Sequence, residues 1–395
     1  MDVLIVGAGV AGTTLAYWLR RAGHRPTVLE QAPALREGGY LIDFWGAGFD
    51  VAERMGIVWE LRRRGLRLKR ADQVSRTGRR FASLDPAAFV RGTDDRYVSI
   101  ARADLAATLH DAMLNQGGEP VEVLFDQTVR ALADEGDRVR VELSQDGSRT
   151  FDLVIGADGL HSTVRRLTFG SEDEALVPLG IAVAAYDLEG LSGGEDLVAQ
   201  MYAEVGLQVA SVQRPDGPSM ILLSFRHRGP LPTTRQEQEA FLADRLRGAG
   251  WRVPELLAAM PTARTLYLDE MSQVQLPSWS TGRVALVGDA AASVSPLAGQ
   301  GSALAMVEAY VLAAELDQHG DDHGAAFAAY EDLLRPLITQ KQGAAPGLGL
   351  VFAPRNRRQL WMRQAMMRLA GLPVVRDHAF GSLQDAIELP APAGG

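Results

Sequence analysis

The sequence predicts an α/β fold with one parallel sheet and one mostly antiparallel sheet, followed by a C-terminal helix. Short apolar runs without polar alternation occur at 3–6, 27–29 and 284–287, and again in FDLVIG before residue 157. Such runs are typical of parallel strands that are buried on both faces. The runs between residues 176 and 228 are instead separated by Gly, Pro and Asp turns, which is typical of antiparallel strands.

The two sheets are expected to belong to two domains, because 395 residues are many for one hydrophobic core. We expect the parallel, Rossmann-like sheet to be assembled from three separated segments, 1–72, 98–172 and 274–335. The segments 73–97 and 173–273 would form the second domain, and 336–395 a bridging helix and tail. A binding site between the two domains follows from this arrangement.

Composition excludes several classes of function. The net charge of −9 offers no basic surface for a phosphate backbone, so we expect no nucleic-acid partner. The absence of cysteine excludes disulfides, Cys metal sites and thiol-based electron transfer, and no metal cluster is visible among the other residues. No apolar stretch reaches the roughly 20 residues of a membrane span, so we expect no membrane-spanning helix. We expect a cytoplasmic protein that is a monomer or a homodimer.

The first chemical motif is G-x-G-x-x-G at Gly7, Gly9 and Gly12, which lies between the first strand and a helix with one apolar side. These glycines allow a tight turn and a close approach of the backbone to a pyrophosphate at the helix N-terminus. Glu30 ends the second strand, at the distance where a carboxylate can accept from an adenosine ribose. The motif predicts a bound dinucleotide but leaves NAD and FAD open, and Glu30 alone could be a solvated strand end.

The second motif follows the strand at 284–287. Gly288-Asp289 precedes a loop with Pro296, Gly299, Gln300 and Gly301, which opens a long helix. A carboxylate at this strand end can accept from a ribitol hydroxyl, and backbone amides at a helix N-terminus stabilise an anionic flavin edge. If this motif stood alone, a structural Gly-Asp turn without a ligand would also explain it.

The third motif, Asp158-Gly159 in FDLVIGADGLHSTVRRL, makes the pattern specific. The order of G-x-G-x-x-G with Glu30, Asp158-Gly159 and Gly288-Asp289 with the PLAGQG loop resembles the para-hydroxybenzoate hydroxylase family of flavin monooxygenases over essentially the whole chain. The resemblance implies an FAD-binding domain of the glutathione reductase type, with Asp158 near the pyrophosphate and the passing nicotinamide. It implies that Asp289, Pro296, Gly299, Gln300 and Gly301 hold the flavin.

Two arginines are added by the same resemblance. Arg102 opens a helix after the middle strand and would hold the flavin or its phosphates, although an ordinary pair with Asp104 is an alternative. Arg36 would lie near the pyrophosphate. The absence of cysteine excludes a covalent tether through Cys but leaves one through His open, and we expect FAD to be bound without a covalent bond.

The implied chemistry is that of a single-component monooxygenase. NAD(P)H reduces FAD, dioxygen adds at the flavin C4a position, and the hydroperoxide transfers one oxygen atom to the substrate. No second glycine motif is present, so NAD(P)H would bind transiently. Hydroxylation, epoxidation and Baeyer–Villiger oxidation all remain open. So do a reductase or saturase, a halogenase-like enzyme, whose W-x-W-x-I-P signature is missing here, and a flavin-binding partner without turnover.

The substrate is expected to be aromatic or polycyclic. The segment GGYLIDFWGAGFDVAERMG is similar to the corresponding stretch of tetracycline-modifying flavin monooxygenases, although Phe44 and Trp45 could be core aromatics. Strand position suggests five chamber-wall residues in the second domain, each of which could instead be a sheet-surface or packing residue: Gln200, Gln213, Leu222, Ser224 and Arg226. Pro296 and Met362 are two further candidates for contact with the substrate.

The C-terminal region is expected to contain a break at 343–354 and then a helix. Trp361, Met362, Ala365, Met366 and Leu369 share one face of that helix, with Arg363 away from it. We expect this face to dock between the domains and wall the active site, with a membrane-surface helix as the alternative.

Overall fold

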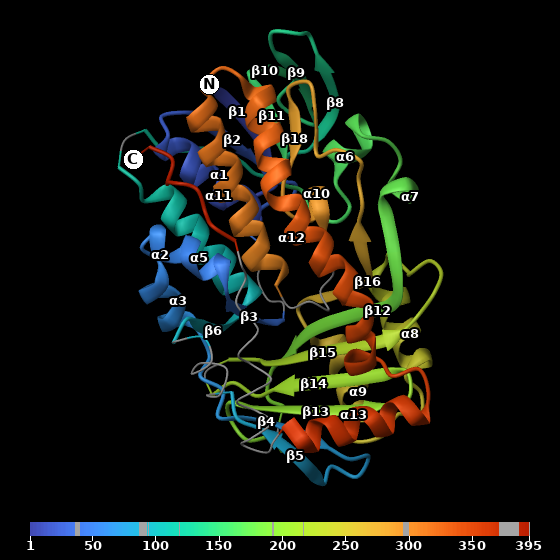
Figure 1. Cartoon of the computed structure of the whole chain (residues 1–395). Coiled ribbons are helices and arrows are strands. Elements are labelled where there is room, and N and C mark those ends of the chain that lie inside the picture. Colours follow the sequence, from blue (N-terminus) through green and yellow to red (C-terminus); the bar gives the residue numbers. More distant parts are fainter. Residues whose placement is uncertain are drawn as a thin grey trace.

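The computed structural model describes residues 1–35, 40–86, 93, 95–117, 119–191, 193–215, 217–294, 300–370 and 387–394. Within these ranges the predicted α/β class is confirmed, since a largely parallel sheet and a largely antiparallel sheet lie at opposite ends of the molecule (Figure 1). Among the helices that these residues form, none is both long and apolar enough to cross a membrane.

The parallel sheet has six strands in the order β17-β18-β11-β1-β2-β7. Its strands come from distant parts of the chain: β1 (Asp2–Val6), β2 (Arg25–Leu29), β7 (Glu122–Leu124), β11 (Leu153–Gly156), β17 (Ser280–Thr281) and β18 (Val284–Leu286). All neighbours pair in parallel except β17 with β18. The carboxyl ends of β1, β11 and β18 therefore meet at one edge of the sheet, where each of the three sequence motifs begins.

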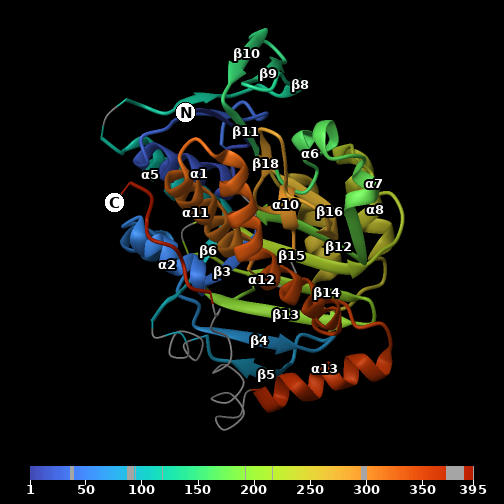
Figure 2. The same cartoon turned by 45° about the horizontal axis from the view of Figure 1, so that its top comes forward.

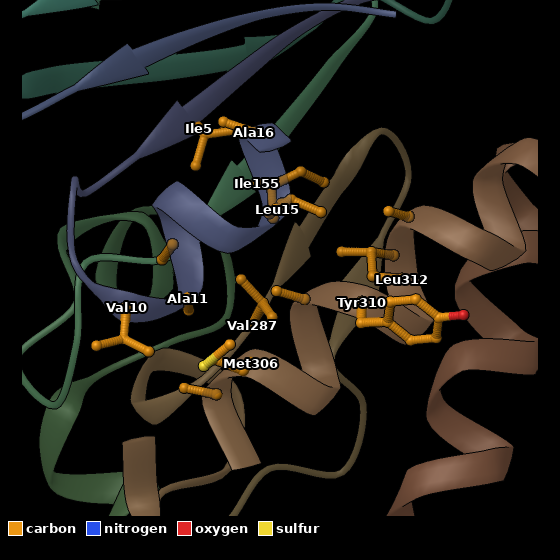
Figure 3. Close-up of a cluster of buried hydrophobic side chains, with 14 of the residues drawn as sticks. Ile5, Val10, Ala11, Leu15, Ala16, Ile155, Val287, Met306, Tyr310 and Leu312 are labelled. Atoms are coloured by element: carbon orange, nitrogen blue, oxygen red, sulfur yellow. The ribbon is translucent and has the colours of Figure 1, made fainter. Parts of the chain in front are cut away.

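Helices cover this sheet. They are α1 (Val10–Arg21), α5 (Arg102–Leu114), α11 (Gly301–His319) and α12 (His323–Phe352). Figure 3 shows how Ile5 of β1 and Ile155 of β11 face Leu15 of α1 and Leu312 of α11 in one apolar cluster. A three-stranded sheet, β8 (Val129–Asp134), β9 (Val139–Leu143) and β10 (Ser148–Phe151), and the short α6 (Thr163–Thr168) complete this side.

The seven-stranded sheet has the order β16-β12-β15-β14-β13-β4-β5. Its strands are β4 (Arg70–Val74), β5 (Arg80–Leu84), β12 (Leu176–Leu188), β13 (Val198–Glu204), β14 (Leu207–Val212), β15 (Ser219–Arg226) and β16 (Leu266–Val274). Its neighbours are antiparallel except β4 and β13. The expected boundary placed residues 70–72 in the first FAD-binding segment. In the structure β4 begins at Arg70, so these residues belong to the seven-stranded sheet.

One face of the seven-stranded sheet is covered by α8 (Arg235–Arg245), α9 (Val253–Ala259) and the short 3-10 helix η1 (Met260–Thr262), which build a second apolar core. The other face looks toward the two-stranded ribbon of β3 (Leu41–Trp45) and β6 (Tyr97–Ala101). Three short helices, α2 (Ala47–Arg54), α3 (Val58–Arg64) and α7 (Glu172–Ala175), and α10 (Asp289–Ala292) complete the connections.

The break expected at 343–354 is wrong, because α12 continues as one helix to Phe352 and also crosses the boundary drawn at residue 336. The end of the helix is held by tertiary hydrogen bonds. Ser224 Oγ donates to Phe352 O at 2.9 Å, and Arg226 Nε donates to Ala353 O at 2.8 Å. The last carbonyls of a helix lack partners within it, so these donors stabilise its C-terminal end.

The orientation of α13 (Arg357–Ala370) also differs from the prediction. Figure 2 shows α13 beside β5, at the edge of the seven-stranded sheet. Trp361 is 69% exposed and Met362 46% exposed, whereas Arg363 is only 1% exposed. Arg363 donates to Val351 O and to Gln208 Oε1, both at 2.7 Å. Two hydrogen-bond acceptors, of which Gln208 is buried, thus hold Arg363 on the inward side of the helix.

Candidate active site

The glycines of the first motif divide into two kinds. A Cβ at Gly7, where φ is +109°, would lie 2.5 Å from Ala157 O, and a Cβ at Gly12 would lie 1.9 Å from Gly7 O. These two positions pack strand against helix and tolerate no side chain. Gly9, which caps α1, has no atom within 4 Å of its Cβ direction. The N-terminus of α1 therefore faces open space through Gly9, as a pyrophosphate site requires.

Glu30 lies beside this helix end and is oriented by the backbone. Its Oε2 accepts from Ala8 N at 3.0 Å, and its Oε1 accepts from Ala32 N at 2.9 Å. An ionised carboxylate has about four acceptor positions, so both oxygens keep capacity for ribose hydroxyls. The residue is bound to the glycine loop itself and is more than a solvated strand end.

Asp158 is used to start a helix. Its Oδ2 accepts from Thr163 N at 2.7 Å and Val164 N at 3.1 Å, and its Oδ1 accepts from Ser162 Oγ. These bonds satisfy the free amides at the N-terminus of α6. In this structure the Asp158 carboxylate therefore fixes the loop after β11.

A fully buried arginine ties this loop to the Gly-Asp motif. Arg165 Nη2 donates to Leu160 O at 2.5 Å and Arg165 Nη1 donates to Ala290 O at 3.0 Å. Burial lowers the pKa of Arg165, although nearby carboxylates oppose this. One guanidinium thus joins the second motif to the third.

Glu308 of α11 accepts a hydrogen bond from the Gly-Asp turn. Gly288 has a φ of +67°, and its N–H donates to Glu308 Oε2 at 2.7 Å. Tyr330 OH donates to Leu286 O at 3.2 Å and lies 3.4 Å from the same Glu308 oxygen. Burial raises the pKa of Glu308 to about 8; the Gly288 N–H opposes this rise, and the charge of Asp289 adds to it. The buried carboxyl therefore holds a proton up to near-neutral pH.

Asp289 itself, at the first position of α10, is exposed and accepts no hydrogen bond from the described residues. Its charge acts on Arg102, whose pKa is lowered by burial but raised overall by Tyr40, Asp289 and Tyr267. Arg102 N also donates to Tyr40 O at 3.1 Å. In the described part of the chain no ion pair joins Arg102 to Asp104, so Arg102 faces the site around Asp289.

The N-terminus of α11 offers a further polar group. Gln300 is 5% exposed; its Oε1 accepts from Lys341 Nζ of α12, while its Nε2 has no acceptor among the described residues. Gly301, the next residue, has open space in its Cβ direction. A buried, unpartnered amide beside an open helix end fits a ligand edge. Arg36, Pro296 and Gly299 lie outside the described residues.

A cavity of about 200 Å³ lies between the β3–β6 ribbon and the seven-stranded sheet. Its polar lining residues are Tyr40, Asp43, Asp85 and Tyr97. The remainder are apolar: Leu41, Leu68, Ala71, Leu84, Pro86, Ala199, Met201, Ala210, Val212, Met220, Ile221 and Leu222. Tyr40 connects this cavity to the group of Arg102 and Asp289. The cavity therefore opens next to the predicted cofactor residues.

Of the predicted wall residues, Leu222 lines this cavity. Gln200 does not, because it lies between the lining residues Ala199 and Met201 and so points to the opposite face of β13. Gln213 accepts from Gly194 N at 3.1 Å in a neighbouring loop.

Ser224 and Arg226 share the sheet face of Leu222, but their donors bind the end of α12 as described above. Met362 is exposed on α13 and is not among the cavity residues. Ser224, Arg226 and Met362 therefore do not line this cavity, and their place in a substrate chamber stays a prediction.

Sequence reasoning missed several residues. Glu308 had a usable signal, because a lone acid in the apolar helical run GSALAMVEAYVL is expected to have a buried partner. Asp43 and Tyr97 come from two strands that are distant in sequence, and Tyr40 directly precedes the first of them, so no local pattern shows that they meet. The contact of Lys341 with Gln300 was likewise not predictable from the sequence, because no local pattern relates two residues 41 positions apart.

Comparisons with known proteins show the family to which the chain belongs. Residues 1–338 match the family model described as FAD binding domain. The chain is 37% identical over 344 residues to protein Rv1260 of Mycobacterium tuberculosis, covering 86% of this chain and 91% of the relative. It is 33% identical to a flavin-dependent monooxygenase of Legionella longbeachae, covering 87% of each.

Among solved structures, tetracycline destructase Tet(51) aligns with a TM-score of 0.82 and 30% identity, covering 99% of both chains. The glycine loop, the carboxylates Glu30 and Asp289 and the open end of α11 are the groups that such a cofactor domain needs. This chain is therefore a member of the FAD-binding family of flavin-dependent monooxygenases.

Proposed function

We propose that this FAD-dependent enzyme uses NAD(P)H and dioxygen to hydroxylate an aromatic or polycyclic small molecule. Epoxidation and Baeyer–Villiger oxidation are other outcomes of the same cofactor chemistry. The observation that carries the proposal is the cavity beside Tyr40, whose wall is mostly apolar and which borders the cofactor residues Arg102 and Asp289. An apolar cavity with few polar groups is suited to a ring-bearing substrate.

The residues present fit FAD. The open N-terminus of α1 at Gly9 would hold the pyrophosphate, Glu30 the ribose, Asp289 the ribitol, and Gln300 with Gly301 the flavin edge. When bound, FAD accepts hydride from NAD(P)H and activates dioxygen for transfer of one oxygen atom.

The protein's own contribution is position, charge and exclusion of water. Arg165 binds Ala290 O and Glu308 binds Gly288 N. These two contacts, on either side of Asp289, fix the orientation of the start of α10. The apolar wall of β13, β14 and β15 removes water from the substrate side. A dry, preorganised site strengthens each electrostatic contact inside it.

Transient use of NAD(P)H is part of the proposal. The sequence contains one glycine fingerprint, at residues 7–12, and FAD would occupy it. The structural neighbour Tet(51) supports the substrate class, because it is a tetracycline destructase and tetracycline is a polycyclic compound.

The test is a screen of phenolic and polycyclic compounds with FAD-loaded enzyme. We expect a true substrate to accelerate NAD(P)H oxidation and oxygen uptake together, and to yield a product heavier by one oxygen atom. Oxygen uptake without a heavier product would contradict oxygenation. A saturated or reduced product formed without oxygen would instead support a reductase or saturase.

A further inference from the structure

Asp43 is a carboxylate in the wall of the substrate cavity. It lies in the middle of β3, directly opposite Ser99 of β6. Tyr97 OH donates to Asp43 Oδ1 at 2.6 Å, and Ser99 Oγ donates to the same oxygen at 2.5 Å. The residue is exposed, and its Oδ2 accepts no hydrogen bond from any described residue. Two hydroxyls thus hold one oxygen and leave the other available.

The described residues that line this cavity carry acidic but no basic side chains. Asp43 and Asp85 both line it, and its described lining residues include no Lys, Arg or His. The remaining wall is apolar apart from Tyr40 and Tyr97. A second anion placed beside the Asp43 carboxylate is disfavoured by the repulsion of like charges.

We propose that Asp43 selects substrates that present an O–H or N–H group to its Oδ2 and excludes those that carry a carboxylate. The inference rests on the proposed function and narrows its substrate class to neutral or cationic ring compounds. The ring would lie against Ala199, Met201 and Leu222, and its polar group would point toward β3.

The geometry supports recognition by Asp43. Tyr97 and Ser99 are donors to the carboxylate, which fixes its rotation and leaves an oriented acceptor. A hydrogen bond to a charged acceptor contributes roughly ten- to hundredfold in affinity over a group that cannot donate. A ligand lacking the donor would also leave a partly desolvated carboxylate unpaired, which adds to the discrimination.

Three probes of one ring size separate the effects: 2-naphthol, 2-methoxynaphthalene and 6-hydroxy-2-naphthoate. Their binding to the FAD-loaded enzyme is measured by calorimetry without NAD(P)H, so that no turnover is required. We expect naphthol to bind at least tenfold more tightly than the methoxy compound and at least tenfold more tightly than the naphthoate. A naphthoate that binds as tightly as naphthol would overturn the proposal.

Asp43→Asn tests the residue. The neutral amide should reduce the preference for naphthol over the methoxy compound severalfold and improve naphthoate binding relative to the other two probes. Leu222→Ala is the matched control in the same cavity, and we expect it to weaken all three probes while preserving their order. An unchanged order in Asp43→Asn, with FAD content equal to that of the wild type, would refute the role of Asp43. If Asp43→Asn does not retain FAD, Asp43→Glu is used, and it must keep the wild-type order.

The two proposals fail in different ways. If the probes bind in the expected order but no compound with a donor group is oxygenated, the proposed function is wrong and the selectivity of Asp43 stands. If an aromatic carboxylate proves to be a good oxygenation substrate, the proposed function stands and the inference about Asp43 is wrong.

Discussion

Replacing Glu308 with Gln tests whether a protonated carboxyl supports the Gly-Asp turn. The wild-type side chain is fully buried, accepts from Gly288 N and has a pKa raised by burial to about 8 from an ordinary 4.5. Because the folded protein then holds the proton more tightly than the unfolded chain, Glu308 makes the free energy of unfolding fall as pH rises from 4.5 to 8. Gln keeps the carbonyl acceptor for Gly288 and cannot ionise.

The size of the effect follows from the pKa difference. One pKa unit corresponds to about 1.4 kcal/mol, so between pH 5 and pH 8 the wild type should lose roughly 3 kcal/mol through this group. Glu308→Gln should abolish most of that loss, so the two proteins diverge at pH 8 and converge toward pH 5.

The measurement is urea unfolding at pH 5 and pH 8 with saturating FAD, followed by tryptophan fluorescence. Trp279 is a suitable reporter, since its ring lies 5.5 Å from that of Tyr330, which contacts Glu308. Asp332→Asn, at an exposed position of α12, is the control and should retain the wild-type pH dependence. If Glu308→Gln shows the same loss of stability between the two pH values as the wild type, Glu308 is ionised when folded and the reasoning fails.

Four further predictions concern the cofactor, the hydrogen bonds of His161 to Asp269 and Glu172, and the end of α12. Asp289→Ala should weaken FAD binding ten- to hundredfold through loss of a charged acceptor, while Asp332→Ala should not; equal affinities measured by flavin fluorescence would show that Asp289 does not hold FAD. FAD should appear in the supernatant after acid precipitation, and flavin that stays with the protein would mean a covalent bond. Hydrogen bonding to Asp269 and then to Glu172 raises the pKa of His161 to about 9, against the effect of burial. Its stabilising contribution should be full below pH 6.5 and lost as the pH rises through 9. His161→Gln should therefore lower the free energy of unfolding, measured with urea, at pH 6 but not at pH 10, by no more than about 1 kcal/mol for this half-exposed group. Arg226→Met should reduce the free energy of unfolding by about 1–3 kcal/mol without altering probe binding; weaker probe binding at unchanged stability would restore its predicted role in the chamber wall.

The sequence by itself determined the features that depend on local backbone geometry. Gly7 is required because its φ is +109°, and Gly12 because a Cβ there would lie 1.9 Å from Gly7 O of the same strand–turn–helix unit. Glu30 bonds to Ala8 and Ala32 within the same unit. The class of each sheet followed from the length and alternation of its apolar runs, which reflect burial on one face or two. The FAD-binding class was therefore predictable from motif order and spacing.

Only the tertiary structure decided which polar groups meet. Ser224 and Arg226 are on the predicted face of β15, yet α12 arrives there from more than a hundred residues away and takes their donors. The direction of Gln200 depends on the position of the strand turn, because a shift of one residue exchanges the two faces of a strand. On α13 the side chain of Arg363 lies inward, where it donates to Val351 O and Gln208 Oε1, although the apolar pattern of the helix predicted that Arg363 would lie away from the docked face.

The substrate cavity shows the same division most clearly. Asp43 belongs to a stretch whose resemblance was visible in sequence, but its partners Tyr97 and Ser99 come from another strand, and its apolar neighbours come from the seven-stranded sheet. Local sequence constrains dihedral angles and burial periods over a few residues. The site is instead made by long-range strand pairing and by competition among buried donors and acceptors, and these are settled only when the whole chain packs.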